Sequence, residues 1–82
     1  MEDEIKDILS DFTKKHEGIK CELQEDILLD IFKIVMDDEK TGKRVTSGIY
    51  IQALELSCLS VEDEINIVLN EMISKLRSGT NG

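Results

Sequence analysis

The sequence has no proline and no tryptophan, and only five glycines and one histidine among its 82 residues. Proline and glycine form the tight turns between short strands, so their scarcity argues against an all-β sandwich. Hydrophobic residues make up 40% of the chain and charged residues 34%. Because this composition is too apolar for a disordered tail and the length allows one core, we expect a single compact helical domain.

Recognisable reaction chemistry is also lacking. Cys21 and Cys58 form no CxxC pair, and the spacings of 5 and 37 residues from His16 to Cys21 and from Cys21 to Cys58 match no zinc template. We expect two reduced thiols, no disulfide and no metal site. One histidine leaves no convincing nucleophile–base pair, and the chain has no glycine-rich phosphate loop. The sequence therefore predicts no catalytic residues, no cofactor and no enzymatic activity.

Basic residues are in the minority, with 10 Lys and Arg against 18 Asp and Glu and a formal net charge of −8. Direct binding to nucleic acid or to anionic lipid needs a basic face, so we expect neither. The chain starts Met-Glu-Asp-Glu rather than with a cationic signal peptide, and no uninterrupted apolar run exceeds four residues. We expect a cytoplasmic protein without membrane insertion. The acidity suggests an alternative function, a nucleic-acid mimic whose carboxylates occupy the basic groove of a DNA- or RNA-binding protein.

Two amphipathic helices are indicated near the ends of the chain. Residues 2–15 place an apolar stripe on one helical face, with acidic residues in the first turn and lysines in the last. Gly18 is expected to adopt a left-handed conformation just beyond this helix. Residues 61–77 show the clearest helical spacing, and Ser60 is expected to be its N-cap.

The segment 23–37 carries apolar side chains over an arc of roughly 240° when its residues are plotted as a helix. Such a helix would be the central one of the fold. Leu29 and Met36 lie at i and i+7 on the far edge of this arc. We expect them to project beyond the intramolecular core.

The segment 37–46 is a polar loop with three basic residues, Lys40, Lys43 and Arg44, which form a basic contact spot on an acidic body. The loop lacks the ligands of a calcium site. A third helix is expected from Thr46 or Ser47 to about residue 57. A short strand at residues 48–51 is the competing interpretation, because these residue types favour strands.

Together these patterns predict an all-α fold, a small four-helix bundle with a central, widely apolar second helix. Residues 1–77 would form one helical domain and residues 78–82 a disordered tail. Four apolar residues exceed what this core uses: Leu29, Met36, Ile51 and Ile67. We expect them to form a partner-binding surface, so that the protein acts as a small regulator or adaptor that docks on another protein and forms a homodimer.

The stretch from Ala53 to Met72 resembles the helical hairpin of late-transcription coactivators of T4-type phages, with Leu59-Ser60 at an apolar-Ser-apolar turn between two acidic helices. In size and acidity the chain is also similar to the cytoplasmic antiholins of such phages. The resemblance implies a phage-encoded modulator of transcription or lysis. No functional residue is carried over from either family.

Overall fold

The computed structural model describes residues 1–78 and shows an α+β fold, three helices on a three-stranded antiparallel sheet. The prediction of an all-α four-helix bundle, and of a purely helical domain over residues 1–77, is therefore wrong. In chain order the elements are α1 (Glu2–Lys15), β1 (Ile19–Asp26), β2 (Ile31–Asp38), β3 (Arg44–Tyr50), α2 (Ile51–Leu56) and α3 (Val61–Ser78). Of the predicted tail, Ser78 is the last residue of α3, and residues 79–82 lie outside the described residues.

Helix α1 has the bounds that the sequence predicts. Its stripe buries Ile5, Leu9 and Phe12 against the rest of the protein. Gly18 follows with a φ of 84°, the left-handed conformation expected beyond this helix. The chain reverses there and enters β1.

The segment 23–37 is a β-hairpin and not a central helix. Phe32, Ile34 and Met36 alternate with less buried residues along β2, and their side chains all point into the core. A helix would have spread the same apolar residues around its circumference. They lie in the middle strand of the sheet, where the backbone of β2 bonds to a neighbour on each side.

The register places two chemically different faces on the sheet. Ile34 pairs with Leu23 of β1 and with Ser47 of β3, and these side chains point toward the helices. Val35 pairs with Glu22 and Thr46 on the opposite face. Within residues 1–78, the helices therefore cover one face and leave the other open.

The predicted third helix is correct only in its last half. Residues 44–50 form β3, and α2 occupies only residues 51–56, with Leu54 buried. The competing strand interpretation of residues 48–51 therefore holds as far as Tyr50. The strand partner that the sequence did not suggest is β2, the segment assigned to a helix.

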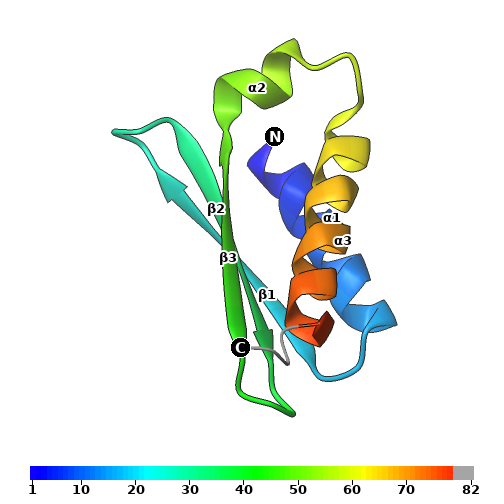
Figure 1. Ribbon diagram of the computed structural model, residues 1–82. Helices are drawn as coiled ribbons and strands as arrows, with labels where there is room; N and C mark the ends of the chain where they lie inside the picture. The colour runs from blue at the N-terminus through cyan, green and yellow to red at the C-terminus, as the bar shows by residue number, and fades with distance from the viewer. Residues whose placement is uncertain (79–82) are drawn as a thin grey trace.

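Helix α3 begins as predicted, because the Ser60 hydroxyl accepts a hydrogen bond of 3.1 Å from the Asp63 N–H. The helix buries five side chains: Ile65, Leu69, Met72, Ile73 and Leu76. Together with α1 it forms a helical layer over the inner face of the sheet (Figure 1). Figure 1 also shows α2 and the β1–β2 turn at one end of the molecule, opposite the β2–β3 turn. Within residues 1–78, no helix is long and apolar enough to cross a membrane.

Candidate protein-docking surface

Three consecutive apolar residues are displayed at the turn between β1 and β2. The exposed fraction is 82% for Ile27, 96% for Leu28 and 59% for Leu29. A hairpin turn normally carries polar residues and glycine, because its side chains meet water. Leu28 makes almost no contact with its own protein, so its hydrophobicity contributes nothing to the core.

The turn is held by its two flanking aspartates. The Asp26 carboxylate accepts a hydrogen bond of 3.1 Å from the Leu29 N–H, three residues on, which ties the turn to the end of β1. Asp30 has a φ of 57°, a left-handed conformation that aspartate tolerates better than most residues. The apolar residues are therefore presented on a turn of defined conformation.

Helix α2 lies beside this turn. The Ile51 N–H, at the start of α2, donates a hydrogen bond of 2.9 Å to the Asp30 carbonyl. Tyr50 precedes it and pairs with Ile31, directly next to the turn. Further exposed apolar side chains follow along the chain at Leu56 and Leu59.

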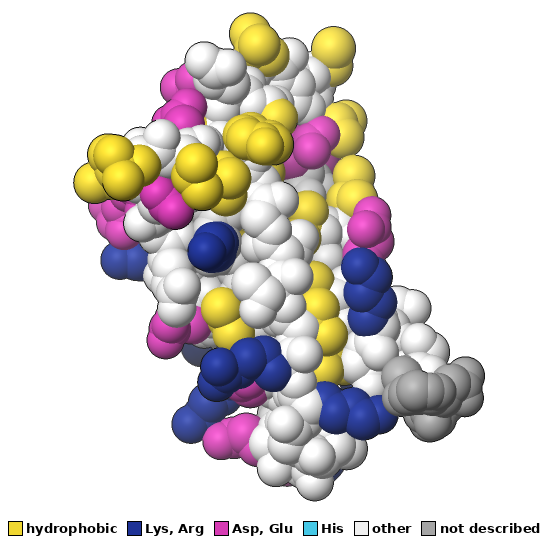
Figure 2. All heavy atoms as spheres, turned by 60° about the vertical axis from the view of Figure 1, so that its left-hand side comes forward, with side chains coloured by type: hydrophobic (Ala, Val, Ile, Leu, Met, Phe, Trp, Pro, Cys, Tyr) yellow, Lys and Arg dark blue, Asp and Glu magenta, His cyan; other side chains and the backbone are white. Residues whose placement is uncertain are grey.

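We call this surface the apolar end. It consists of Ile27, Leu28, Leu29, Tyr50, Leu56 and Leu59. Figure 2 shows hydrophobic side chains concentrated toward this end and most lysine and arginine side chains toward the other. The protein is therefore polarised along its length.

Carboxylates surround the apolar end. Glu25, Asp26 and Asp30 flank the turn, and Glu55 is exposed on α2. A shallow hollow of about 360 Å³ next to the turn is lined by Glu25, Asp26, Ile27, Leu28, Gln24 and Lys33. The apolar end is thus an apolar tip with a mostly acidic rim.

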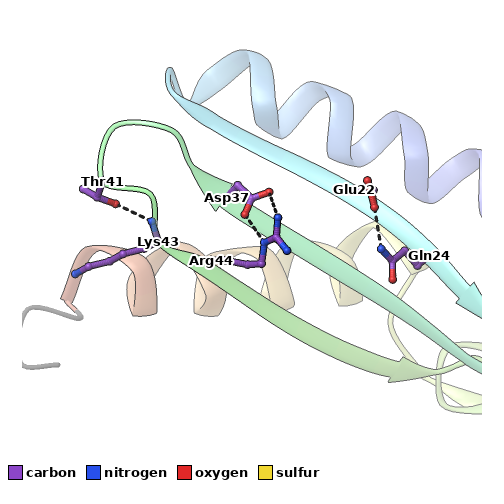
Figure 3. A network of polar contacts seen from close by, with 6 residues as sticks. All are labelled: Glu22, Gln24, Asp37, Thr41, Lys43 and Arg44. Atoms are coloured by element: carbon purple, nitrogen blue, oxygen red, sulfur yellow. Dashed lines mark hydrogen bonds and ion pairs between the residues drawn. The ribbon is translucent and has the colours of Figure 1, made fainter.

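The open face of the sheet is polar along its length. Arg44 Nε donates to Asp37 Oδ1 at 2.7 Å, and Gln24 Nε2 donates to Glu22 Oε1 at 2.8 Å (Figure 3). Basic and acidic side chains alternate here, since Lys20 also pairs with Glu39 at 3.1 Å. Such a mixed surface favours neither a polyanion nor a polycation.

The structure separates the four residues predicted for partner binding. Leu29 is in the apolar end, and Ile51 is half-buried at the start of α2 beside it. Ile67 is 47% exposed on α3, apart from the turn. Met36 is fully buried, so the expectation that it projects beyond the core is wrong. Its side chain points inward because β2 alternates, and no partner reaches it in this fold.

The predicted basic spot lies in and next to the β2–β3 turn. Lys40, Lys43 and Arg44 are all exposed there. The Lys43 N–H donates to the Thr41 hydroxyl at 3.3 Å, and the Arg44 guanidinium is held by Asp37. The three residues are neighbours, and the Arg44 charge is already paired within the protein.

The two thiols differ in environment. Cys58 is exposed in the connection between α2 and α3, and Cys21 is half-buried on β1. Burial raises the pKa of the Cys21 thiol, the Thr13 hydroxyl lowers it, and the Asp37 charge raises it further. Among residues 1–78, no group of three or more His, Cys, Asp and Glu side chains is placed to hold a metal ion.

The sequence interpretation did not identify Ile27 and Leu28 as surface residues. The one feature of the sequence that indicates a turn here is the placement of Ile-Leu-Leu between two aspartates, because aspartate favours turns. On a helix the same residues belong to an apolar arc, so their exposure was not foreseen. Comparison with protein-family models, curated proteins and solved structures gives no match to this chain.

Proposed function

We propose that this protein is a small, acidic, cytoplasmic protein-binding regulator or adaptor that docks its apolar end on a partner protein. The observation that carries the proposal is the display of Ile27 and Leu28, 82% and 96% exposed, on an ordered turn. Large apolar side chains are normally buried in the core. A cluster of them on the surface marks an interaction site.

Ile27 and Leu28 would supply a large part of the favourable energy of such docking. Burying a Leu or Ile side chain completely contributes about 1.5–3 kcal/mol, so Ile27 and Leu28 together contribute roughly 3–6 kcal/mol before the costs of association. The turn is ordered by Asp26 and Asp30, which reduces the conformational entropy lost on binding. Apolar side chains held on an ordered turn therefore keep more of their burial energy as affinity.

The experiment compares the wild-type protein with the variants Leu28→Ser and Ile67→Ser as baits in quantitative affinity purification. Both positions are exposed, but only Leu28 is in the apolar end. We expect Leu28→Ser to lose the captured partner at least about tenfold, since the side chain supplies over 1.4 kcal/mol. Equal capture by wild type and Leu28→Ser would overturn the proposal, and selective loss with Ile67→Ser would move the interface to α3.

A second copy of the chain is the partner that the homodimer prediction names. Sedimentation at micromolar concentration tests it directly. A dimer that dissociates on Leu28→Ser would make the apolar end a self-association surface, and a monomer would leave the apolar end to a different protein.

The alternative function, a nucleic-acid mimic, requires rows of carboxylates. Lys20, Lys33 and Arg44 interrupt the carboxylates on the open sheet face. A mimic would compete with DNA for its target with steep salt dependence, whereas docking by Leu28 would change little with salt. A phage-encoded modulator of transcription or lysis is the biological setting that we propose from the resemblance of residues 53–72.

A further inference from the structure

Among the described residues 1–78, no strand pairs with the outer edge of β1, because the sheet order is β1-β2-β3. The Glu39 N–H donates to the Gly18 carbonyl at 2.8 Å, so these two residues form a hydrogen-bonded pair. In an antiparallel ladder, every second residue of a strand forms such a pair with the same neighbouring strand. Even-numbered residues of β1 therefore bond to β2. The N–H and C=O groups of Cys21 and Leu23 point away from the sheet, where an added strand would bond to them.

A groove runs beside this edge, between β1 and α1. It has a volume of about 480 Å³. Its apolar lining includes Leu9 of α1 and both Cys21 and Leu23 of β1. A strand added to the edge of β1 would place alternate side chains in this groove, since side chains of a strand alternate between the faces.

Two lysines line the groove at a useful spacing. Lys6 and Lys14 lie on α1, eight residues apart, and both line the groove. Eight helical residues rise by about 12 Å, and four strand residues extend about 13 Å. The first and fifth residues of an added strand, which share one face, therefore match the two ammonium groups.

The groove lining carries two ammonium groups and one carboxylate, that of Glu22, so its charges favour acidic residues only beside Lys6 and Lys14. Lys14 makes no ion pair within residues 1–78, and Lys6 pairs with Glu2 across one helical turn at 3.2 Å. When the third residue of the added strand lies opposite Cys21, its first and fifth residues lie opposite Leu23 and Ile19. This register keeps their carboxylates away from Glu25.

A second copy of this chain fits the same edge less well. Antiparallel pairing of β1 with its copy puts both α1 helices on one face of the joined sheet. Lys6 and Lys14 of the two copies then face one groove, with four ammonium groups in total. Like charges brought together at an interface oppose association.

We propose that the edge of β1 and the groove beneath α1 bind an extended segment of a partner protein as an antiparallel fourth strand. The segment has the pattern acidic-x-apolar-x-acidic. Main-chain hydrogen bonds to Cys21 and Leu23 give affinity, and the groove with Lys6 and Lys14 gives specificity. This surface is separate from the apolar end, so the proposal does not depend on docking there.

The test uses a capped peptide, Glu-Thr-Val-Thr-Glu, and two readouts. In a titration followed by NMR, the amide resonances of residues 19–25 and of the groove side of α1 should shift. The rate of alkylation with iodoacetamide should fall at Cys21 when the peptide is bound. The rate at Cys58 should stay unchanged, because Cys58 is exposed and does not line the groove. Cys58 is thus an internal control in each sample.

Two peptide controls separate the contributions. Lys-Thr-Val-Thr-Lys keeps the strand pattern and reverses the charges. A peptide with N-methylvaline keeps every side chain but lacks the central N–H that would bond to Cys21. Each should bind about tenfold more weakly, the effect of about one hydrogen bond or ion pair in this setting.

Two protein variants test the same bond from the other side. Cys21→Pro removes an N–H that points away from the sheet and does not affect the hydrogen bonds between β1 and β2. An edge strand tolerates proline at such a position. Cys21→Val keeps the N–H. We expect peptide binding to drop about tenfold in Cys21→Pro relative to Cys21→Val. The N-methylated peptide gives the same comparison without altering the protein, should Cys21→Pro not fold.

Equal binding of all three peptides, or shifts confined to the open sheet face or α3, would overturn the proposal. Sedimentation of the free protein is the last arm. A dimer in which Cys21 is protected from alkylation without any peptide would assign the edge to a second copy and likewise overturn it.

Discussion

Asp30 and Asp26 decide where the apolar turn residues lie. Asp30 adopts a φ of 57°, and the Asp26 carboxylate bonds the Leu29 N–H. Aspartate supports such turns because its short side chain bonds to nearby backbone and its backbone tolerates the left-handed region. The two aspartates thus fix a turn conformation in which Ile27, Leu28 and Leu29 are exposed to solvent.

Replacing Asp30 with valine should therefore destabilise the protein. A β-branched residue at positive φ costs about 1–2 kcal/mol, whereas asparagine tolerates this conformation. Urea unfolding followed by circular dichroism would show a lower midpoint for Asp30→Val and nearly none of this loss for Asp30→Asn. Identical midpoints for the two variants would show that the turn imposes no backbone constraint.

The raised pKa of the Cys21 thiol predicts a pH dependence. The folded state holds the thiol proton more tightly than the unfolded state, so this contribution to stability is complete below the ordinary thiol pKa. It is lost as the pH rises through the folded pKa. We expect the urea midpoint of the wild type to fall more steeply at alkaline pH than that of Cys21→Val. Parallel curves would contradict the assignment.

The same burial slows the chemistry of this thiol. At neutral pH, Cys58 should react with iodoacetamide faster than Cys21, because the thiolate is the nucleophile and Cys21 is also less accessible. In urea both should react alike. Mass spectrometry of partially labelled protein measures the two rates within one sample.

At the scale of elements, β2 connects the two layers of the fold. It lies between β1 and β3, and Ile34 and Met36 reach the helices with no exposed surface. A shift of one residue in its register would exchange this apolar row for Lys33, Val35 and Asp37. The burial of one face therefore specifies the pairing of all three strands.

Truncation on the two faces of β2 should accordingly differ. Ile34→Ala leaves a cavity in the core and should cost about 2–5 kcal/mol, a large part of the stability of a domain this small. Val35→Ala, one residue away on the open face, should cost less than half as much. Chemical denaturation of both variants measures the difference, and similar losses would place Val35 in a covered interface.

For the whole molecule, the excess of negative charge opposes the compact state. The net charge is −8, and surface ion pairs such as Lys6–Glu2 are exposed and contribute little. Repulsion between carboxylates at such distances is weakened by salt. The apolar end and the acidic body are thus the two main surface features that a partner meets.

Sodium chloride should therefore raise the melting temperature at neutral pH. The gain reflects screened repulsion, and it should be smaller for Asp11→Asn, which removes one exposed carboxylate from α1. Differential scanning calorimetry over a salt series checks this. A melting temperature that falls with salt would show that ion pairs outweigh repulsion.

The amino-acid sequence by itself determined the two long helices, the cap at Ser60, the left-handed Gly18 and the acidity. These features depend on neighbours within a few residues: an apolar stripe at helical spacing, a side-chain cap and a charge count. The sequence also placed a turn at Leu59-Ser60, which lies between the end of α2 at Leu56 and the start of α3 at Val61.

Only the tertiary structure decided the state of residues 23–37. The segment Ile31–Asp38 alternates well enough for a strand, yet its apolar residues also fit a helical arc. A helix bonds its backbone internally, whereas β2 needs β1 on one side and β3, up to 19 residues along the chain, on the other. With these partners present, Met36 entered the core, and Ile27 and Leu28 remained in the turn as the exposed residues.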